Sequence, residues 1–533
     1  MRDSMCDSII WRCTPVAART MVCFVLSAVI VTACAQSQQP ASGAPATLII
    51  CNAMVINGAG APPEGPRDIV IQGDRIASIL LSATPSRCSS SDAKAITPIR
   101  RIEARGKYII PGLIDMHMHF IDLVPLDYQY KLLIAHGVTT VRVFSIGDMS
   151  PEQMVAEKRR VASGSVVAPR LYVYPFWSES PEDPRFHSAD DAAAVVREWK
   201  TKGIDGVKMA SLPGEYPDVL AAVGAEARKQ QMGFAVHIAQ DAVYPMNAVR
   251  VAEAGATTIE HHYGYAEASF TGQQIQQLPP GYNFANTPER FYQTGAAWLQ
   301  ADLSKLHTSV IDSLLATSAK TGFTIVPTMV AYEPNRDVER AETLDWQKDF
   351  ALPALLHQWS PDPKNPESSY FHHWTSTQEA DWSQVFHRWM DFIDDYKNRG
   401  GKVAVGSDPG FIFNLWGFGT IRELELLEQA GFSPLETLHA ATETGAIALG
   451  NHQLGVIRPG YSADLLVLDE NPLDDFKVLY GTGATRLDAD GKPVKVRALR
   501  YTVRDGIVFD AQALLKELTS EVAARRASTP AIK

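Results

Sequence analysis

Between residues 111 and 454, short apolar stretches alternate with stretches of helical pattern, and this alternation restricts the fold more than any other feature. The eight apolar stretches begin near Leu113, Thr140, Leu171, Val207, Phe234, Thr258, Thr324 and Val403. Helical stretches lie between them, for example 217–231 and 242–254. Eight strand-helix units predict an α/β fold with a parallel (β/α)8 TIM barrel. A doubly wound open sheet is the alternative, since strand counting does not separate the two.

Both flanks of this region consist of short β-branched runs separated by turn residues. Segments 47–51 and 68–72 precede it, and the Gly-Asp pair at 73–74 signals a hairpin. Segments 464–468 and 498–503 follow it. Because the two ends share this pattern, we expect the N- and C-terminal segments to form one small β-sandwich domain together.

These patterns divide the chain into consecutive units, because 533 residues are too many for one compact fold. The expected units are a signal peptide over 1–34, a flexible tether over 35–46, the first part of the β-sandwich over 47–110, the barrel over 111–454, the second part of the β-sandwich over 455–510, and a C-terminal helix and tail over 511–533. The excess length is therefore expected in the leader and in insertions within the barrel.

The N-terminal segment is typical of an export signal. Arg12 and Arg19 precede the apolar run 21–33, which is too short to span a bilayer but suits a secretory signal peptide. The run ends in Val-Thr-Ala-Cys34, which resembles a bacterial lipobox, and in that family the cysteine is lipidated. Cleavage after Ala35 by an ordinary signal peptidase is the alternative. We expect an exported protein, periplasmic or held at the outer membrane of a bacterium as a lipoprotein.

All six cysteines lie within the first 88 residues. After removal of the leader, only Cys51 and Cys88 would remain in the folded body, in an oxidising compartment. A Cys51–Cys88 disulfide is one hypothesis, and two buried free thiols are the other. In either case the rest of the chain offers no thiolate for a metal site.

The charge balance bears on the class of partner. The chain carries 49 Lys and Arg against 60 Asp and Glu, a net charge of −11, and has no dense basic run. Nucleic acid is therefore a poor candidate partner. A hydrophobic content of 46% excludes disorder of the whole chain. We expect a globular protein that acts on a small molecule, and the sequence leaves its oligomeric state open.

Polar residues collect at the carboxyl ends of five predicted strands. They are His117 and His119 on the first strand, Lys208 on the fourth, His237 on the fifth, His261 on the sixth and Asp408 on the eighth. Side chains alternate along a strand, so the two histidines of the first strand point to the same side. In a (β/α)8 barrel the carboxyl ends of the strands meet at one mouth, where active sites lie.

Each of these residues alone has an ordinary structural explanation. A lone strand histidine is commonly structural, a lysine among apolar residues often extends its amine to water, and an aspartate after Gly-Ser commonly caps a helix. The conjunction carries the argument. Neutral imidazoles and a carboxylate suit zinc and similar first-row ions, so the sequence predicts a metal centre.

Segment 111–119 resembles the signature of the amidohydrolase superfamily, and segment 455–468 is similar to its C-terminal sheet segment. The resemblance runs from about residue 47 to about residue 510. It is nearest to the imidazolonepropionase-like and Xaa-Pro dipeptidase-like branch, where a lysine on strand four is common. The resemblance implies a metal-dependent hydrolase with a (β/α)8 barrel and a small β-sandwich built from both chain ends.

The resemblance also implies two divalent metal ions, with zinc as the favoured ion. His117, His119 and Asp408 would hold one metal, and His237 and His261 would hold the other. Lys208, carboxylated by carbon dioxide, would bridge them. The chemistry of the bridge stands on its own, because an ammonium has no lone pair for a cation, whereas a carbamate is an anionic oxygen ligand.

The implied reaction is hydrolysis of an amide or peptide-like C–N bond by a metal-bridged hydroxide. Asp408 would be the catalytic residue that takes a proton from the nucleophile and passes it to the leaving nitrogen. Lys208 and the Ile-Ala-Gln-Asp sequence after His237 favour amide hydrolysis over deamination. Two alternatives are a lactone or ester hydrolase with the same site, and a non-catalytic surface-anchored binding barrel, although such a barrel would be expected to lose ligands.

Two long insertions, at about 265–305 and 330–402, leave from the predicted catalytic mouth. The second holds five tryptophans and several other aromatic residues. These aromatic residues predict either a lid with an aromatic pocket or extra helices with a core of their own. Residues near the mouth that would help to bind substrate are Arg142, His262, Tyr265 and Tyr332.

Overall fold

Eight parallel strands follow one another through the centre of the chain, at the positions that the alternation predicted. The structure, a computed structural model, describes residues 48–89, 99–177, 184–210, 214–270, 275–362, 364 and 370–528. One sheet contains β6 (Leu113–Phe120), β7 (Val138–Ile146) and β8 (Arg170–Val173). The other contains β9 (Gly206–Met209), β10 (Gly233–His237), β11 (Thr258–Glu260), β12 (Thr324–Val326) and β13 (Lys402–Val403).

Backbone hydrogen bonds connect these two sheets at both edges. The amide of Lys208 in β9 donates to the carbonyl of Pro175 at 2.9 Å, beside a parallel bridge between Phe176 and Lys208. The amide of Met116 in β6 donates to the carbonyl of Val405, just after β13, at 2.8 Å. The strands within each sheet are also parallel. The carboxyl ends of all eight strands therefore lie on the same side.

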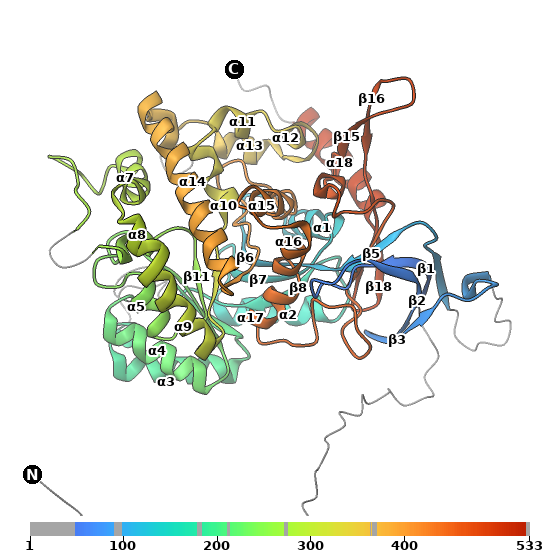
Figure 1. Cartoon of the computed structure of the whole chain (residues 1–533), viewed down its shortest axis with the longest axis horizontal. Helices are drawn as coiled ribbons and strands as arrows, with labels where there is room; N and C mark the ends of the chain where they lie inside the picture. Colours follow the sequence, from blue (N-terminus) through green and yellow to red (C-terminus); the bar gives the residue numbers. More distant parts are fainter. Residues whose placement is uncertain are drawn as a thin grey trace, which may run out of the picture. The chain divides into compact units, whose positions relative to one another are not determined.

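Helices follow most of these strands (Figure 1). Those up to β12 are α1 (Leu126–Ala135), α2 (Pro151–Ala162), α3 (Ala189–Lys202), α4 (Pro217–Lys229), α5 (Ala248–Glu253), α6 (Tyr265–Ala268), α7 (Thr287–Gln300), α8 (Leu303–Lys305) and α9 (Ile311–Thr321). Those after it are α10 (Met329–Tyr332), α11 (Val338–Glu342), α12 (Trp346–Phe350), α13 (Pro353–Trp359), α14 (Ser376–Asn398), α15 (Phe418–Gln429), α16 (Pro434–Ala440), α17 (Glu443–Ala448) and α18 (Ala511–Ser528).

Local chemistry sets where these helices begin. Helix α2 starts with a capping box. The side chain of Ser150 accepts a hydrogen bond from the backbone amide of Gln153, and the side chain of Gln153 accepts one from the backbone amide of Ser150. Helix α5 begins at Ala248, six residues later than the expected start at 242. Pro245 has no amide to donate within a helix, and the side chain of Asn247 caps the helix.

Strands from both ends of the chain share one sheet, as the common pattern of the two flanks predicted. Its order is β18 (Ile507–Asp510), β17 (Leu499–Arg504), β14 (Leu465–Leu468), β5 (Tyr108–Pro111), β1 (Leu48–Val55), β2 (Glu64–Gln72) and β3 (Arg75–Leu81), with β4 (Arg100–Glu103) also paired to β1. The N- and C-terminal segments meet where β5 pairs with β14. A two-layered sandwich stays a prediction. A separate hairpin, β15 (Ala484–Leu487) and β16 (Pro493–Val496), lies in the C-terminal segment.

Cys51 and Cys88 form a disulfide in this sheet domain. Cys51 lies in β1, and Cys88 lies in a 3-10 turn, η1 (Arg87–Ser89), that packs beside it. Of the two hypotheses for these cysteines, the structure contains the disulfide. The segments predicted as a signal peptide, 1–34, and as a flexible tether, 35–46, lie outside the described residues.

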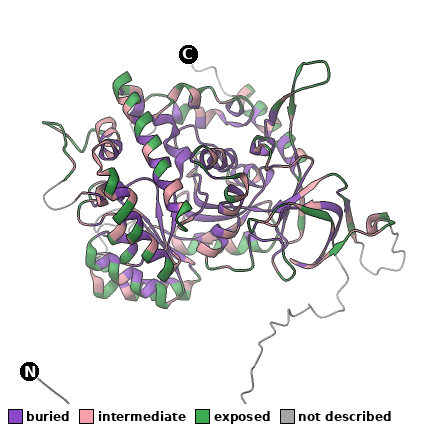
Figure 2. Ribbon diagram, viewed as in Figure 1, coloured by how far each residue is buried: buried purple, intermediate pink, exposed green. Residues whose placement is uncertain are grey.

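The aromatic residues of the second insertion are mostly core residues. Burial extends through the helices of this insertion as well as through the strands (Figure 2). Trp359, Trp382 and Trp389 are at most 1% exposed and belong to the same hydrophobic core as the central strands. The second insertion therefore forms extra helices, as one of the two predictions had it, but its tryptophans pack into the core of the central strands and not into a core of their own.

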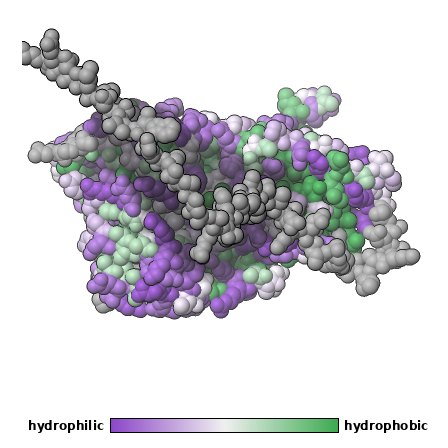
Figure 3. All heavy atoms as spheres, turned by 60° about the horizontal axis from the view of Figure 1, so that its bottom comes forward, coloured by the Kyte–Doolittle hydropathy of each residue, from purple (hydrophilic) through white to green (hydrophobic). Residues whose placement is uncertain are grey.

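Among the described residues, no helix is long and apolar enough to cross a membrane. The face drawn in Figure 3 mixes hydrophilic areas with smaller hydrophobic ones.

The disulfide gives a prediction about stability. Replacing Cys88 with serine should lower the free energy of unfolding by about 4 kcal/mol, because the bond closes a loop with a sequence separation of 37 residues. Urea unfolding of both proteins measures the difference. A reducing agent should destabilise the wild type by a similar amount and leave the variant unchanged. Equal unfolding midpoints for the two oxidised proteins would show that the bond contributes no stability.

Candidate metal centre

Six polar side chains from five strands line one cavity of about 600 Å³. They are His117 and His119 of β6, Lys208 of β9, His237 of β10, His261 directly after β11, and Asp408, which follows β13. These are the six residues that the sequence predicted as metal ligands. The cavity is of the size of ordinary small-molecule sites.

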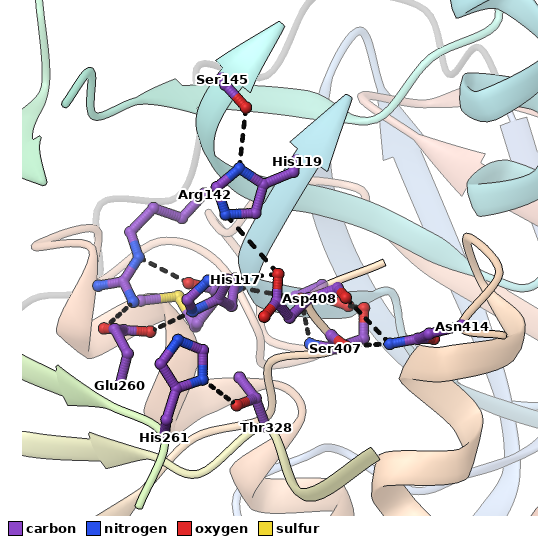
Figure 4. Close-up of polar contacts among 12 residues, drawn as sticks. His117, His119, Arg142, Ser145, Glu260, His261, Thr328, Ser407, Asp408 and Asn414 are labelled. Carbon is purple, nitrogen blue, oxygen red and sulfur yellow. Dashed lines mark hydrogen bonds and ion pairs between the residues drawn. The ribbon is translucent and has the colours of Figure 1, made fainter. Parts of the chain in front are cut away.

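Three of the six residues could hold one ion between them. One ligand atom each from His117, His119 and Asp408 lies within 4.8 Å of the other two. The Nε2 atoms of the two histidines are 3.6 and 3.7 Å from Oδ1 of Asp408, respectively. Figure 4 shows the three side chains pointing toward one another. Two imidazoles and a carboxylate are a ligand set that zinc and related ions accept.

The remaining three residues lie next to this cluster. The ring centroid of His261 is 4.5 Å from that of His237 and 4.7 Å from that of His117. Nζ of Lys208 is 4.1 Å from the centroid of the Phe144 ring. Among the described residues it has no hydrogen-bond partner, although it is buried. A buried amine with no partner is costly unless it is neutral or modified, and burial lowers the pKa of Lys208 to about 8.

Outer contacts fix the orientation of three imidazoles. Nδ1 of each ring hydrogen-bonds to an oxygen atom. For His117 this atom is Oε2 of Glu260, at 2.7 Å. For His119 it is Oγ of Ser145, at 2.8 Å, and for His261 it is Oγ1 of Thr328, at 2.6 Å. Nε2 of each ring is left for a ligand. Burial holds the pKa of each of these histidines well below its usual range, so the rings are neutral as a metal requires. The residues present therefore fit a bound metal.

Glu260 links His117 to a buried cation. Its Oε1 accepts from Arg142 Nη2 at 2.7 Å and from Thr258 Oγ1 at 2.6 Å. Arg142 also donates to the carbonyl of Met116 at 2.7 Å. The side chains of Arg142 and Glu260 are 0% exposed, so each charge needs the other. An ionised Glu260 in turn favours the tautomer of His117 that carries its proton on Nδ1.

A second buried carboxylate positions the loop that carries Asp408. Asp115 in β6 accepts from the amide of Ser407 at 3.0 Å and from its hydroxyl at 2.6 Å. Asp408 itself has a positive φ of 51°, a left-handed conformation that is uncommon for residues other than glycine. A Cβ on Gly406 would lie 2.8 Å from Cβ of His117, so only glycine lets the loop approach β6 so closely.

Asp408 is placed to carry a proton. Burial raises its pKa to about 7, while the nearby amine of Lys208 acts in the opposite direction. A carboxyl group with a pKa near neutrality can both accept and return a proton at physiological pH.

The cavity wall beyond the six central residues is largely aromatic. It contains Ile121, Phe176, Gln240, Asp241, Tyr263, Phe284, Arg290, Phe291, Tyr332 and Phe411. Phe176 stacks on His119, with ring centroids 5.8 Å apart. Phe284, Arg290 and Phe291 belong to the first insertion, so that insertion forms part of the cavity, whereas the second contributes Tyr332.

Of the four residues predicted to contact substrate, only Tyr332 lines the cavity. Arg142 is fully buried, and its guanidinium donates hydrogen bonds to Met116, Thr258 and Glu260. Tyr265 is buried against Phe392, with ring centroids 5.1 Å apart.

His262 also differs from the expectation that it binds substrate. Its ring lies behind the wall among Tyr263, Tyr332, Trp382 and Trp389. Alternation along the chain turns it away from His261 and into this aromatic cluster.

Sequence reasoning did not identify two residues that the structure places in or beside the site, Glu260 and Arg290. Glu260 directly precedes His261, and its place two residues after Thr258 on the same strand face was the signal that could have found it. Arg290 lies on α7, a helix of the first insertion. No sequence pattern in this helix indicates that it lines the cavity.

Solved structures with the same fold exist at low sequence identity. A Xaa-Pro dipeptidase with bound methionine matches with a TM-score of 0.56 and 19% identity, over 87% of this chain and 99% of that one. A putative prolidase from Bifidobacterium longum matches with a TM-score of 0.57 and 20% identity, over 90% and 100%. Ochratoxinase from A. niger matches with a TM-score of 0.53 and 17% identity, over 87% and 95%. The chain therefore shares their α/β fold.

Curated relatives match over short segments only. Ochratoxinase of Aspergillus niger is 38% identical over 79 residues, which is 14% of this chain and 15% of that protein. Adenine deaminase of Desulfatibacillum aliphaticivorans is 33% identical over 99 residues, 18% of this chain and 15% of that protein. The aligned part thus spans 15% of the length of each relative.

A model of the amidohydrolase family matches residues 108–287 and 384–496. These segments include the six residues that line the centre of the cavity, and they leave out most of the second insertion. The matched segments make up more than half of the chain, and the protein therefore belongs to the amidohydrolase family.

Proposed function

We propose that this protein is a binuclear metal-dependent hydrolase that cleaves the C–N bond of a small amide or peptide-like substrate. The single observation that carries the proposal is the convergence of four imidazoles, one carboxylate and one buried, unpartnered lysine on one cavity. Membership of the amidohydrolase family and the eight parallel strands support it. We further propose that the eight strands close into a (β/α)8 barrel.

Two divalent ions, with zinc as the favoured identity, would be held as the sequence suggested. His117, His119 and Asp408 would hold one ion, His237 and His261 the other, and a carboxylated Lys208 would bridge them. When bound, such ions lower the pKa of water and polarise a carbonyl group. The low pKa of Lys208 supports its carboxylation, because the neutral amine is the form that reacts with carbon dioxide.

The chain's own residues supply the proton transfers and the shape of the site. Asp408 would take the proton of the attacking nucleophile at Oδ1 or Oδ2 and deliver it to the leaving nitrogen, which departs as a neutral amine. Phe176, Phe291 and Phe411 exclude water from the wall, which strengthens the electrostatic interactions inside. Glu260 keeps the Nδ1 proton of His117 in place.

For the N-terminus we propose export with lipidation at Cys34 and a location at the periplasmic or outer-membrane face. Mass spectrometry of the mature N-terminus tests this directly. A lipid-modified Cys34 supports the proposal, and an unmodified protein that begins at Gln36 contradicts it.

Lys208→Ala should reduce the metal content from two ions to at most one per chain and abolish activity. Without a side-chain oxygen between the two ligand groups, the second ion loses its bridge. Metal analysis after dialysis measures the stoichiometry, and a screen of dipeptides and N-acyl amino acids measures activity. Lys348→Ala, an exposed lysine on α12, is the control and should keep both ions. Full activity and two ions in Lys208→Ala would exclude the bridge.

Asp408→Asn should lower kcat by about a hundredfold or more and change KM far less, because the amide cannot accept the nucleophile's proton. Steady-state kinetics of the metal-loaded variant provides the measurement. Asp241→Asn removes a carboxylate of the same cavity that lies outside the three-residue cluster, and its effect on kcat should be smaller. A wild-type kcat in Asp408→Asn would refute the proton-transfer role.

Glu260→Gln should weaken metal binding by about 10- to 100-fold, because His117 loses its anionic partner. Competition with a chelating dye measures the affinity, and circular dichroism checks that the variant is folded. Ser145→Ala removes the neutral partner of His119 and should have a smaller effect. If folded Glu260→Gln binds metal as tightly as wild type, the contact of Glu260 with His117 does not tune the metal site.

A further inference from the structure

A second cavity, of about 270 Å³, lies between the second insertion and the C-terminal segment of the chain. Its walls come from α11, α12 and α15 and from the hairpin β15–β16 with the turn before it. Figure 1 shows α11, α12 and this hairpin on the same side of the molecule. Among the described residues, no residue lines both this cavity and the one at the strand ends. The second cavity is therefore a separate candidate site.

Three cations from three different elements line the second cavity. They are Arg340 of α11, Lys477 of the 3-10 turn η7 (Phe476–Leu479) and Lys495 of β16. Nζ of Lys495 is 2.8 Å from Oδ2 of Asp345, and both side chains are exposed, so this ion pair contributes little stability. Nζ of Lys477, also exposed, is 4.0 Å from Oε2 of Glu425. Both lysines could therefore turn toward a ligand without breaking a buried contact.

The third cation, Arg340, shares its carboxylate with two other arginines. Nη1 of Arg340 is 3.0 Å from Oε2 of Glu333. Arg336 and Arg422 contact the same glutamate at 3.0 and 2.6 Å, and Arg422 also contacts Glu425 at 3.0 Å. Together with the two lysine pairs of the second cavity, these groups comprise five cations and three carboxylates. A local surplus of positive charge in a chain with a net charge of −11 favours an anionic ligand.

Uncharged donors complete the wall of the second cavity. Thr482 and Thr485 line it with their hydroxyl-bearing side chains. Trp346 lines it too, is 6% exposed, and has a buried Nε1 with no hydrogen-bond partner among the described residues. A buried indole N–H without an acceptor costs free energy, and a ligand oxygen placed against it would remove this cost. Cations from three elements, together with hydroxyl and indole donors, suit a tetrahedral oxyanion better than a planar carboxylate.

The wall of the second cavity also reaches the loop that carries Asp408. Three of its residues line a smaller cavity of about 20 Å³ together with three residues of that loop, and the two sets are Arg340, Leu344 and Trp346, and Ile412, Phe413 and Asn414. Ile412 and Phe413 have positive φ values of 41° and 57°, which are uncommon for β-branched and aromatic residues. Nδ2 of Asn414 donates to the carbonyl of Asp408 at 3.1 Å. A shift of Arg340 or Trp346 would therefore act on contacts that position Asp408.

We propose that the second cavity binds a phosphate group, and that its occupancy is coupled to the metal centre through the loop that carries Asp408. The ligand is either free phosphate or a small phosphate monoester, which the volume of the cavity can hold. Arg340, Lys477 and Lys495 would bind the phosphate oxygens, and Trp346 would donate its N–H. This inference goes beyond the proposed hydrolysis, and none of the measurements that test it requires turnover.

The binding test uses inorganic phosphate and glycerol 3-phosphate as probes of the metal-loaded full-length protein. Calorimetry at constant ionic strength measures both affinities. The double variant Lys477→Ala/Lys495→Ala should bind the probes about tenfold more weakly than the wild type. Arg159→Ala/Lys348→Ala removes two exposed cations outside the cavity lining and should bind like the wild type. Tighter binding of the ester would assign the site to phosphate monoesters, and tighter binding of inorganic phosphate would assign it to the free ion.

Trp346→Phe, which keeps a ring and removes the N–H, should also weaken binding, by a smaller factor. Circular dichroism confirms that each variant is folded. An unchanged affinity in Lys477→Ala/Lys495→Ala would place any bound phosphate elsewhere, for example at the metal ions, and would overturn the proposed site. The absence of saturable binding to the wild type would overturn it as well.

The coupling test measures the dissociation constant of the metal by competition with a chelating dye, with and without saturating phosphate. In the wild type we expect phosphate to change this constant about fivefold or more, and in Lys477→Ala/Lys495→Ala to change it far less. Because coupling is reciprocal, removal of the metal should change the phosphate affinity by the same factor. Phosphate that binds the metal directly would affect both proteins alike, so equal changes in the two proteins, or no change in the wild type, would overturn the coupling.

Discussion

The buried ion pair between Arg142 and Glu260 is the interaction on which the centre of this molecule depends. Neither charge has access to water, so each is stable only in the presence of the other. The pair joins β7 to β11 through its own contact, and its hydrogen bonds to Met116 and His117 extend the connection to β6. One electrostatic contact thereby fixes three strands relative to one another and favours one proton position on a candidate metal ligand.

This arrangement explains how the protein keeps several titratable groups in a low-dielectric place. The histidines are neutral because burial disfavours their charged forms. Burial also raises the pKa of Asp408 and lowers the pKa of Lys208, so both pKa values move toward neutral pH. Burying such a cluster in a hydrophobic core costs free energy, whereas a bound cation would interact favourably with its nitrogen and oxygen atoms. Backbone strain at Asp408 and His261, both with positive φ, is further evidence that the site is held by its surroundings rather than by local preference.

The sequence predicted the features that repeat or that sit at fixed places in a repeat. All eight central strands and the six polar residues at their ends were found in this way, because strand ends of a parallel sheet must lie on one side. The sequence did not predict the contacts between distant elements. Arg142 was expected to help bind substrate, whereas in the structure a glutamate 118 positions away pairs with its charge. His262 and Tyr265 lie close to His261 in the sequence but outside the cavity lining, and for His262 the alternation of side chains along the chain accounts for this.

The chain separates the six residues at the strand ends from the part of the cavity wall that the first insertion supplies. The former stand at the ends of strands that are buried on both sides, where substitution disturbs the core. Arg290 stands on α7, in an insertion that could change without moving any of those strands. A gene duplicate of this protein could therefore acquire a different substrate specificity through a few replacements in this one helix, while the residues at the strand ends stay unchanged.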